Sequence, residues 1–297
     1  MISQVRKVQI GVILIVAISM IIVLCTPSTV IPAKASEIGQ PEILATTDFS
    51  GIPQNVIDNA ERRAIKLFGN NEKKCNDFTG QVLALYREAK DVDVLVIVNS
   101  GGWGWSAISQ SNEKELAPGI DGILTELGNS TLWIDYFRTD RNFFGAIGET
   151  MMALSTNPSR GYELASRTQF LTDSLPHLKV ILLGISNGCT ICSGAMPLLA
   201  ENEQVYSIQL GPPVWNNNSH MERVLLLRTN GTIPDSFSHG DMLTILRANL
   251  QSAFGISQQY EGDILLYIGA PGHDYDWKYD WLKLQINNYL TEYFKAN

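Results

Sequence analysis

The chain has 297 residues, of which 45% are hydrophobic, and a formal net charge of −8 at neutral pH. This length and hydrophobic fraction are enough for one large core, and α/β folds of this size commonly form a single domain. The acidic balance argues against a nucleic-acid partner, because phosphate backbones are bound by basic surfaces.

Residues 1–35 have the pattern of an export segment. Arg6 and Lys7 form a basic start, residues 10–25 contain no charged side chain, and an A-x-A cleavage site ends at Ala35. The apolar run is intermediate in length between a signal-peptide core and a short membrane span. We expect cleavage after Ala35, with an uncleaved anchor as the alternative in which residues 10–25 tether the protein to a membrane. Both alternatives place the domain outside the cytoplasm, either secreted or membrane-anchored.

A polar linker over residues 36–52 precedes a single predicted domain over residues 53–297, in which apolar strands alternate with helices. A solvated turn over residues 70–74 separates the first two helices. Helices are expected over residues 53–68, 77–90, 113–127, 145–155, 161–174, 242–254 and 277–293, with one more beginning after Asn187. Strands are expected over residues 92–98, 131–137, 180–183, 205–210, 224–227 and 264–268. The strands are apolar along their whole length, which predicts an α/β fold: a mainly parallel six-stranded sheet with helices on both faces.

The most specific motif follows the strand over residues 180–183. There the sequence Gly184-Ile185-Ser186-Asn187-Gly188 is a G-x-S-x-G pattern between a strand and a helix. A serine in such a sharp turn has a strained backbone, and glycine two residues away on either side relieves the crowding. The serine hydroxyl then projects above the sheet edge, and the N–H of Asn187 points to the same place.

Other chemistry is weakly represented. Three cysteines remain after the export segment, and Cys189 and Cys192 are expected to be small buried side chains of the helix after the serine. We expect no disulfide framework and no cofactor, because no metal-ligand spacing, P-loop or nucleotide-binding glycine fingerprint is present.

From about residue 91 to its C-terminus the chain resembles the α/β-hydrolase superfamily, as a compact exported member with few N-terminal strands and no room for a lid domain. In that family the catalytic residues follow the chain order Ser, then Asp or Glu, then His. The same order occurs here, with Ser186 on the turn, Asp235 after the strand over residues 224–227, and His273 after the last strand. The resemblance implies that Ser186 is the nucleophile, His273 the general base and Asp235 the acid that orients the imidazole.

The acid is the least distinct of the three. Asp235 is the first carboxylate after its strand, and Asp241, at the start of the next helix, is the alternative. For either residue a simple helix-capping role is the competing interpretation. Asp274 directly follows the histidine and is expected to cap or to form an ion pair.

The resemblance also implies an oxyanion hole made by the N–H of Asn187 and by the glycine-rich loop that contains Gly102 and Trp103. Trp103, Trp105 and Tyr275 flank the expected cleft, where they would form an apolar surface for an acyl group. Core or rim packing is the alternative for these aromatic side chains.

The implied activity is hydrolysis of carboxylic esters or thioesters through an acyl-serine intermediate, with a small-molecule ester or acyl compound as substrate. Two alternatives remain, an acyltransferase of the same fold and a non-catalytic binding protein with this architecture.

Overall fold

The protein is described by a computed structural model. The described residues are 49–102, 107–111, 113–136, 158–216, 221–256, 262–265 and 268–295. The expected export segment, the expected linker up to residue 48 and the helix expected over residues 145–155 lie outside these ranges. In the described part of the chain, no helix has both the length and the apolar character needed to cross a bilayer.

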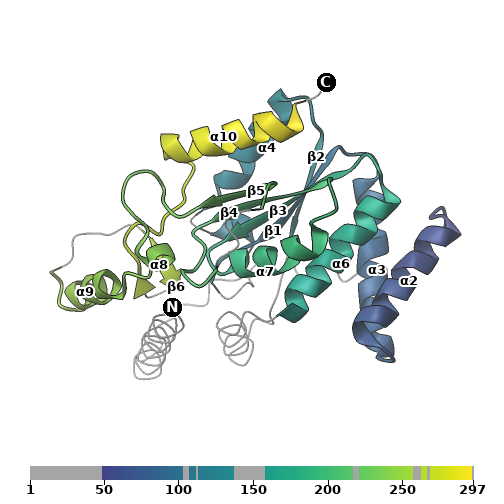
Figure 1. Cartoon of the computed structure of the whole chain (residues 1–297), viewed down its shortest axis with the longest axis horizontal. Coiled ribbons are helices and arrows are strands. Elements are labelled where there is room, and N and C mark those ends of the chain that lie inside the picture. Colours follow the sequence, from purple (N-terminus) through teal and green to yellow (C-terminus); the bar gives the residue numbers. More distant parts are fainter. Residues whose placement is uncertain are drawn as a thin grey trace.

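Five strands form one sheet in which every neighbouring pair is parallel (Figure 1). They are β1 (Val94–Asn99), β2 (Thr131–Asp135), β3 (Lys179–Ile185), β4 (Val205–Leu210) and β5 (Val224–Leu227). Every residue of β1 and β4 is buried, as expected of strands in a sheet that helices cover on both faces. The mainly parallel α/β architecture predicted from the sequence is therefore confirmed.

The strand order is β2-β1-β3-β4-β5. The chain moves outward from β1 to β2 and then returns to the other side of β1 to form β3. The junction of β1 and β3 is therefore a topological switch point, where open parallel sheets bind ligands beyond the carboxyl ends of their strands. β1 ends at Asn99 and β3 ends at Ile185, so the loops that follow these residues meet at that point of the sheet edge.

Four helices lie on one side of the sheet, and the first of them packs mainly on the second and third (Figure 1). They are α2 (Gln54–Phe68), α3 (Glu72–Ala89), α6 (Pro158–Ser174) and α7 (Gly188–Ala195), the last continued by the short η2 (Met196–Leu199). Their buried side chains form one core cluster with Leu95 and Ile97 of β1 and with Val180 and Leu182 of β3. This cluster includes buried side chains of α7 and so packs the helix that follows Ser186 against the sheet.

The opposite face is covered by α4 (Leu116–Glu126) and α10 (Asp280–Phe294), with η1 (Ile108–Gln110) beside them. The intervening strand residues, such as Val96 of β1 and Ile181 of β3, belong to this second cluster. Successive residues of a strand alternate between the two clusters because strand side chains point to opposite faces of the sheet.

The structure does not place the predicted sixth strand in the main sheet. Residues 264–268 were expected to form one more strand of the main sheet, but the described residues contribute five strands to it. Instead, β6 (Asp263–Leu265) and β7 (Ile268–Gly269) form a separate antiparallel pair. Ile264 and Ile268 pack with Phe237 and Ile245 in a third apolar cluster, near α8 (Ser236–His239) and α9 (Met242–Ala253). A short apolar run is buried equally well in either place, so its pattern alone does not decide between them.

The second helix begins earlier than predicted. Residues 70–74 were expected to be a solvated turn, but α3 already begins at Glu72. The side-chain oxygen of Asn71 accepts a hydrogen bond from the Lys74 N–H at 3.1 Å. Asparagine is one of the most favourable N-cap residues, so this cap accounts for the earlier start.

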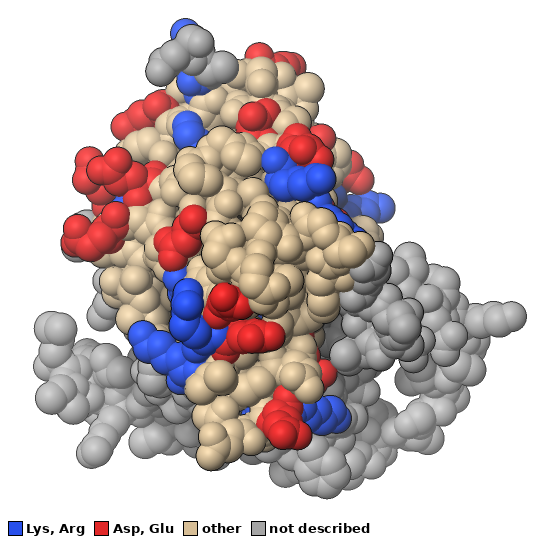
Figure 2. All heavy atoms as spheres, turned by 90° about the vertical axis from the view of Figure 1, so that its right-hand side faces the viewer, with Lys and Arg blue, Asp and Glu red and all other residues tan. Residues whose placement is uncertain are grey.

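Figure 2 shows the face on the right-hand side of Figure 1, where α2 lies. Acidic and basic side chains are interspersed there with larger uncharged areas. The described residues of this face form no continuous basic surface.

Candidate active site

Ser186 joins β3 to α7 in a left-handed backbone conformation. Its φ angle is 51°, and among the residues that the structure describes it is the one non-glycine residue with a positive φ. Such a conformation costs a residue with a side chain about 1–3 kcal/mol. Backbone hydrogen bonds hold it in place: the Ser186 N–H donates to the Leu210 carbonyl at 2.8 Å, and the Ser186 carbonyl accepts from the Cys189 N–H at 3.0 Å. This is the strained strand-to-helix turn that the sequence predicts.

The two glycines that flank the serine are sterically required. A Cβ atom on Gly184 would lie 2.9 Å from the Cα atom of Cys189, and one on Gly188 would lie 1.8 Å from the carbonyl oxygen of Asn99. Real Cβ atoms essentially never approach other heavy atoms within 3.0 Å. The end of β1 and the start of α7 therefore approach each other so closely that only glycine fits.

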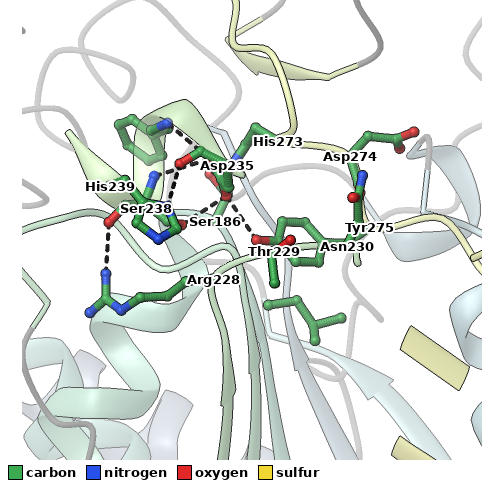
Figure 3. A network of polar contacts seen from close by, with 12 residues as sticks. Ser186, Arg228, Thr229, Asn230, Asp235, Ser238, His239, His273, Asp274 and Tyr275 are labelled. Atoms are coloured by element: carbon green, nitrogen blue, oxygen red, sulfur yellow. Dashed lines mark hydrogen bonds and ion pairs between the residues drawn. The ribbon is translucent and has the colours of Figure 1, made fainter. Parts of the chain in front are cut away.

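Ser186, His273 and Asp235 form a continuous hydrogen-bonded arrangement, which we call the Ser–His–Asp network (Figure 3). The Ser186 Oγ atom lies 2.9 Å from His273 Nε2, and His273 Nδ1 lies 2.8 Å from Asp235 Oδ2. Ser186 and His273 are each 5% exposed, and Asp235 is fully buried. The three residues follow β3, β7 and β5, so the network is assembled from distant parts of the chain.

The loop after β5 brings Asp235 to the network. Thr229 and Pro234 form an isolated antiparallel bridge, which folds this loop back on itself. Inside it, the Asn230 side-chain oxygen accepts a hydrogen bond from the Thr232 N–H at 2.9 Å. The loop is thus fixed by its own contacts before it reaches Asp235, the N-cap residue of α8.

The loop that carries His273 is attached directly to the loop after β5. The Asn230 side-chain amide donates to the Asp274 carbonyl at 3.0 Å. Gly272 has a φ angle of 82°, and a Cβ atom there would lie 2.3 Å from the Pro234 carbonyl oxygen. Because only glycine permits this approach, the two loops position the acid and the histidine relative to each other.

The side-chain carboxylate of Asp235 accepts five hydrogen bonds. Its Oδ1 atom accepts from the N–H groups of Phe237 and Ser238 at 2.9 and 3.0 Å, which caps α8. Its Oδ2 atom accepts from His273 Nδ1, from the Ser238 hydroxyl at 2.8 Å and from the Tyr275 hydroxyl at 2.8 Å. The capping role and the contact with histidine, which the sequence presents as competing interpretations, occur together in this residue.

Burial by itself would raise the pKa of the Asp235 carboxyl, but its surroundings reverse the effect. The charge of His273 and the hydrogen bonds from His273 and Ser238 hold the pKa below its ordinary value of 3.8. The carboxylate is therefore ionised at neutral pH and can only accept hydrogen bonds. His273 Nδ1 must then carry the proton that faces Asp235, which leaves the lone pair of Nε2 directed at the Ser186 hydroxyl.

Gly211, at the end of β4, makes room for two rings of this site. Its φ angle is 64°, and a Cβ atom there would lie 2.6 Å from Tyr275 Cε2 and 2.7 Å from His273 Cε1. The histidine ring can occupy its position beside Ser186 only because residue 211 has no side chain.

Asp241, the alternative acid, and Asp274, which was expected to cap or to form an ion pair, have other partners. Asp241 is exposed and caps α9, where it accepts from the Thr244 N–H at 3.1 Å and from the Thr244 hydroxyl at 2.6 Å. Asp274 accepts from the Tyr279 hydroxyl at 2.6 Å and forms an ion pair with Lys278 at 3.3 Å. Of the two carboxylates proposed as the acid, the structure therefore places Asp235 against His273.

The residues expected at the oxyanion hole are described in part. Asn187 is the N-cap residue of α7, and its side-chain amide donates to the Gly102 carbonyl at 3.4 Å. A Cβ atom on Gly101 would lie 3.2 Å from the Cβ atom of Ser186. The loop after β1 is therefore in contact with the serine turn at the switch point. Trp103 and Trp105 lie outside the described residues.

The position of Tyr275 differs from the one expected from the sequence. It was expected to line a substrate surface, but its side chain is 1% exposed and its hydroxyl is hydrogen-bonded to Asp235. The ring packs behind His273, with the two ring centroids 5.9 Å apart and nearly perpendicular. Residue spacing placed Tyr275 near the site, but it did not reveal on which side of the histidine the ring lies.

Two residues of the site were missed by the sequence analysis. Ser238 donates its hydroxyl to Asp235, and the Phe237 ring packs edge-to-face on the His273 ring at a centroid distance of 5.1 Å. The available signal was the spacing of Asp235 and Ser238, because an Asp at the start of a short helix places its carboxylate near the residue three positions later.

The described cysteines and potential metal ligands lie as follows. Cys189 and Cys192 are fully buried beneath the serine turn, as expected. Among the residues described here, His, Cys, Asp and Glu side chains form no group of three or more that could hold a metal ion.

Comparison with known proteins gives no family assignment. No protein-family model matches the chain, and no curated protein matches its sequence. The geometry of the site is therefore the basis for assigning a function.

Proposed function

We propose that this protein is a serine hydrolase with an α/β-hydrolase fold, which cleaves carboxylic esters or thioesters of small-molecule substrates. The observation that carries this proposal is the Ser–His–Asp network, in which Ser186 Oγ, His273 Nε2, His273 Nδ1 and Asp235 Oδ2 are joined at 2.9 and 2.8 Å. A serine hydroxyl is a weak nucleophile until a base accepts its proton, and this network supplies the base together with the group that orients it.

The backbone supports the same conclusion. Ser186 has a positive φ angle on a strand-to-helix turn, which is the geometry of a nucleophile elbow. The chain order Ser186, Asp235, His273 is the order found in α/β-hydrolases. The site also lies at the topological switch point of the sheet, where a parallel α/β fold is expected to bind its ligand.

In the proposed reaction, Ser186 Oγ attacks the carbonyl carbon of the ester while His273 Nε2 takes the hydroxyl proton. The tetrahedral intermediate collapses to an acyl-serine, and His273 returns the proton to the leaving alcohol or thiol. A water molecule then attacks the acyl-serine with His273 again as the base, which releases the carboxylic acid and restores Ser186. Asp235 stays ionised throughout and stabilises the imidazolium.

The developing oxyanion requires preorganised donors. We propose the N–H of Asn187 as one donor, because the residue after the nucleophile supplies this group in the family, and the loop containing Gly102 and Trp103 as the source of the second. Trp103 and Trp105 remain our candidates for contact with the acyl group. Export of the domain, by a cleaved signal peptide or a retained anchor over residues 10–25, belongs to the same proposal.

Activity-based labelling tests the hydrolase directly. A fluorophosphonate probe should label the folded wild-type protein at neutral pH, and the Ser186→Ala variant should not be labelled. A series of p-nitrophenyl esters of graded chain length should then reveal which acyl groups are cleaved. Folded wild-type protein that neither reacts with the probe nor cleaves any ester would exclude the hydrolase and favour a binding protein. Acyl transfer to an added alcohol in preference to water would identify an acyltransferase.

A further inference from the structure

The acid of the network receives more hydrogen bonds than are needed to orient the histidine. Besides His273 Nδ1, Asp235 Oδ2 accepts from the hydroxyls of Tyr275 and Ser238, each at 2.8 Å. Both donors are almost completely buried, with exposed fractions of 1% for Tyr275 and 2% for Ser238. One carboxylate oxygen is thus surrounded by three buried donors.

We propose that Tyr275 and Ser238 are positioning residues, which set how strongly Asp235 holds the protonated form of His273. This inference rests on the proposed hydrolase function, in which His273 alternates between its neutral and protonated forms. Each hydroxyl takes up part of the negative charge on Oδ2 and fixes that oxygen in front of Nδ1. The base is thereby kept oriented without being locked in its charged form.

The fold keeps both donors in place. Tyr275 lies two residues after His273 in the same loop, and its ring is confined by the close approach of Gly211. Ser238 lies in α8, which Asp235 itself caps through the Ser238 N–H. Burial raises the pKa of Tyr275 well above its ordinary value, and the neighbouring charge of Asp235 raises it further. The phenol therefore remains protonated and acts only as a donor toward the carboxylate.

A purely structural role is the alternative, because a buried tyrosine hydroxyl needs a partner wherever it lies. Tyr289 is an example within this protein: it is 7% exposed, and its hydroxyl donates to the Arg223 backbone carbonyl at 2.7 Å. Tyr289 makes no contact with the Ser–His–Asp network in the described structure, so Tyr289→Phe removes a comparable buried hydroxyl without affecting Asp235. It is the matched control.

Other charged or titratable groups face the same site. The Asp263 carboxylate on β6 interacts electrostatically with His273, and the Cys189 thiol on α7 does so with Tyr275. On α8, His239 Nδ1 lies 2.8 Å from the Asp235 backbone oxygen, and the Arg228 guanidinium donates to the Ser238 carbonyl at 2.8 Å. None of these four side chains is changed in the variants below, so their contribution is constant throughout the comparison.

The direction of the effect follows from the charge. Loss of either hydroxyl leaves more negative charge on Oδ2 and so favours the imidazolium form of His273. The ring should then remain protonated to higher pH. For Tyr275→Phe we expect the NMR titration midpoint of the His273 ring to rise by about half a unit to one unit. Ser238→Ala should shift it in the same direction, and the double variant should shift it further.

The experiment measures the ring titration by NMR, with His273→Gln used for assignment, in the wild type, Tyr275→Phe, Ser238→Ala, the double variant and Tyr289→Phe. The pH profile of kcat/KM for a soluble p-nitrophenyl ester is recorded in parallel, and its acidic limb should move upward with the NMR midpoint. Tyr289→Phe should leave both measurements unchanged. Circular dichroism establishes that each variant is folded. If Tyr275→Phe does not fold, the titration midpoint of the His273 ring in Ser238→Ala tests the proposal instead.

A midpoint in folded Tyr275→Phe and Ser238→Ala that equals that of the wild type would overturn the proposal. A downward shift would do the same. Because the NMR titration needs no turnover, a rise in the midpoint without any ester hydrolysis would support the coupling to His273 while excluding the hydrolase. The two proposals can therefore fail separately.

Discussion

The Asp235 side chain serves both the fold and the candidate active site. One of its oxygens caps α8, while the other faces His273 and two hydroxyl groups. Because both oxygens are used, its replacement should affect the stability of the protein as well as its activity.

Asp235→Asn should lower kcat/KM for an ester by about 10³- to 10⁴-fold, because an amide favours the wrong histidine tautomer. It should also lower the free energy of unfolding by about 2 kcal/mol, since hydrogen bonds to a charged group are lost in a buried site. Asp241→Asn is the control, because asparagine caps a helix as well as aspartate does. Steady-state kinetics and urea denaturation measure the two effects. If Asp241→Asn were the variant with the larger kinetic defect, the acid would be assigned wrongly.

A second prediction concerns Gly211. Alanine at this position would place a methyl group 2.7 Å from the His273 ring, and its backbone would be strained at the native φ angle of 64°. We expect Gly211→Ala to lower kcat/KM by at least about 10²-fold, since a displacement of about 1 Å at a reacting group has this effect. Gly80→Ala in α3 is the matched control, because a Cβ atom there meets nothing within 4 Å. It should leave kcat/KM unchanged, and equal losses in the two variants would contradict this explanation.

Helices and strands are predicted best from the sequence where an apolar run and turn-forming residues indicate the same structure. β3, the turn at Ser186 and α7 combine an apolar run with two glycines, and the structure places them as predicted. The strand over residues 264–268 was predicted incorrectly, because a short apolar run does not specify its pairing partner. The contact of Tyr275 with Asp235 could not be predicted either, since it depends on how two separate loops pack.

A third prediction concerns helix α9, because its two faces differ sharply in burial. Ile245 is fully buried in the third apolar cluster, whereas the adjacent Leu246 is 47% exposed. Ile245→Ala should lower the free energy of unfolding by about 2–4 kcal/mol, through lost burial and the cavity that remains. Leu246→Ala should lower it by less than about 1 kcal/mol. Urea denaturation compares them, and similar losses would show that α9 packs through a different face.

The fold as a whole brings together residues that are far apart in the sequence. The parallel strands β3 and β5 end at a common edge, so the loops after them bring Ser186 and Asp235 to one place. His273, which follows β7 of the separate antiparallel pair, joins them there (Figure 3). The order of these residues along the chain was sufficient to propose the network. Their distances depend on contacts between loops, such as that of Asn230 with Asp274, which no local pattern encodes.

The stability of the whole molecule should depend on pH in opposite ways through two of its carboxylates. Burial would raise the pKa of Asp235, but His273 and the hydrogen bonds hold it below its ordinary value. Burial raises the pKa of Asp135, at the end of β2, and a hydrogen bond from the Ile108 N–H only partly offsets this. A lowered pKa stabilises the fold above the ordinary value of the unfolded chain, whereas a raised pKa stabilises it below that value.

The test compares the wild type with Asp235→Asn and with Asp135→Asn by urea denaturation between about pH 2 and pH 7. The advantage of the wild type over Asp235→Asn should be complete above about pH 4 and should decrease as the pH falls through the lowered pKa of the folded state. The comparison with Asp135→Asn should have the opposite slope, because the wild type loses stability as Asp135 ionises above about pH 4. Each variant is thus the control for the other, since overall changes in net charge affect both in the same direction. Parallel slopes would show that these two carboxylates do not have opposite pKa shifts in the folded protein.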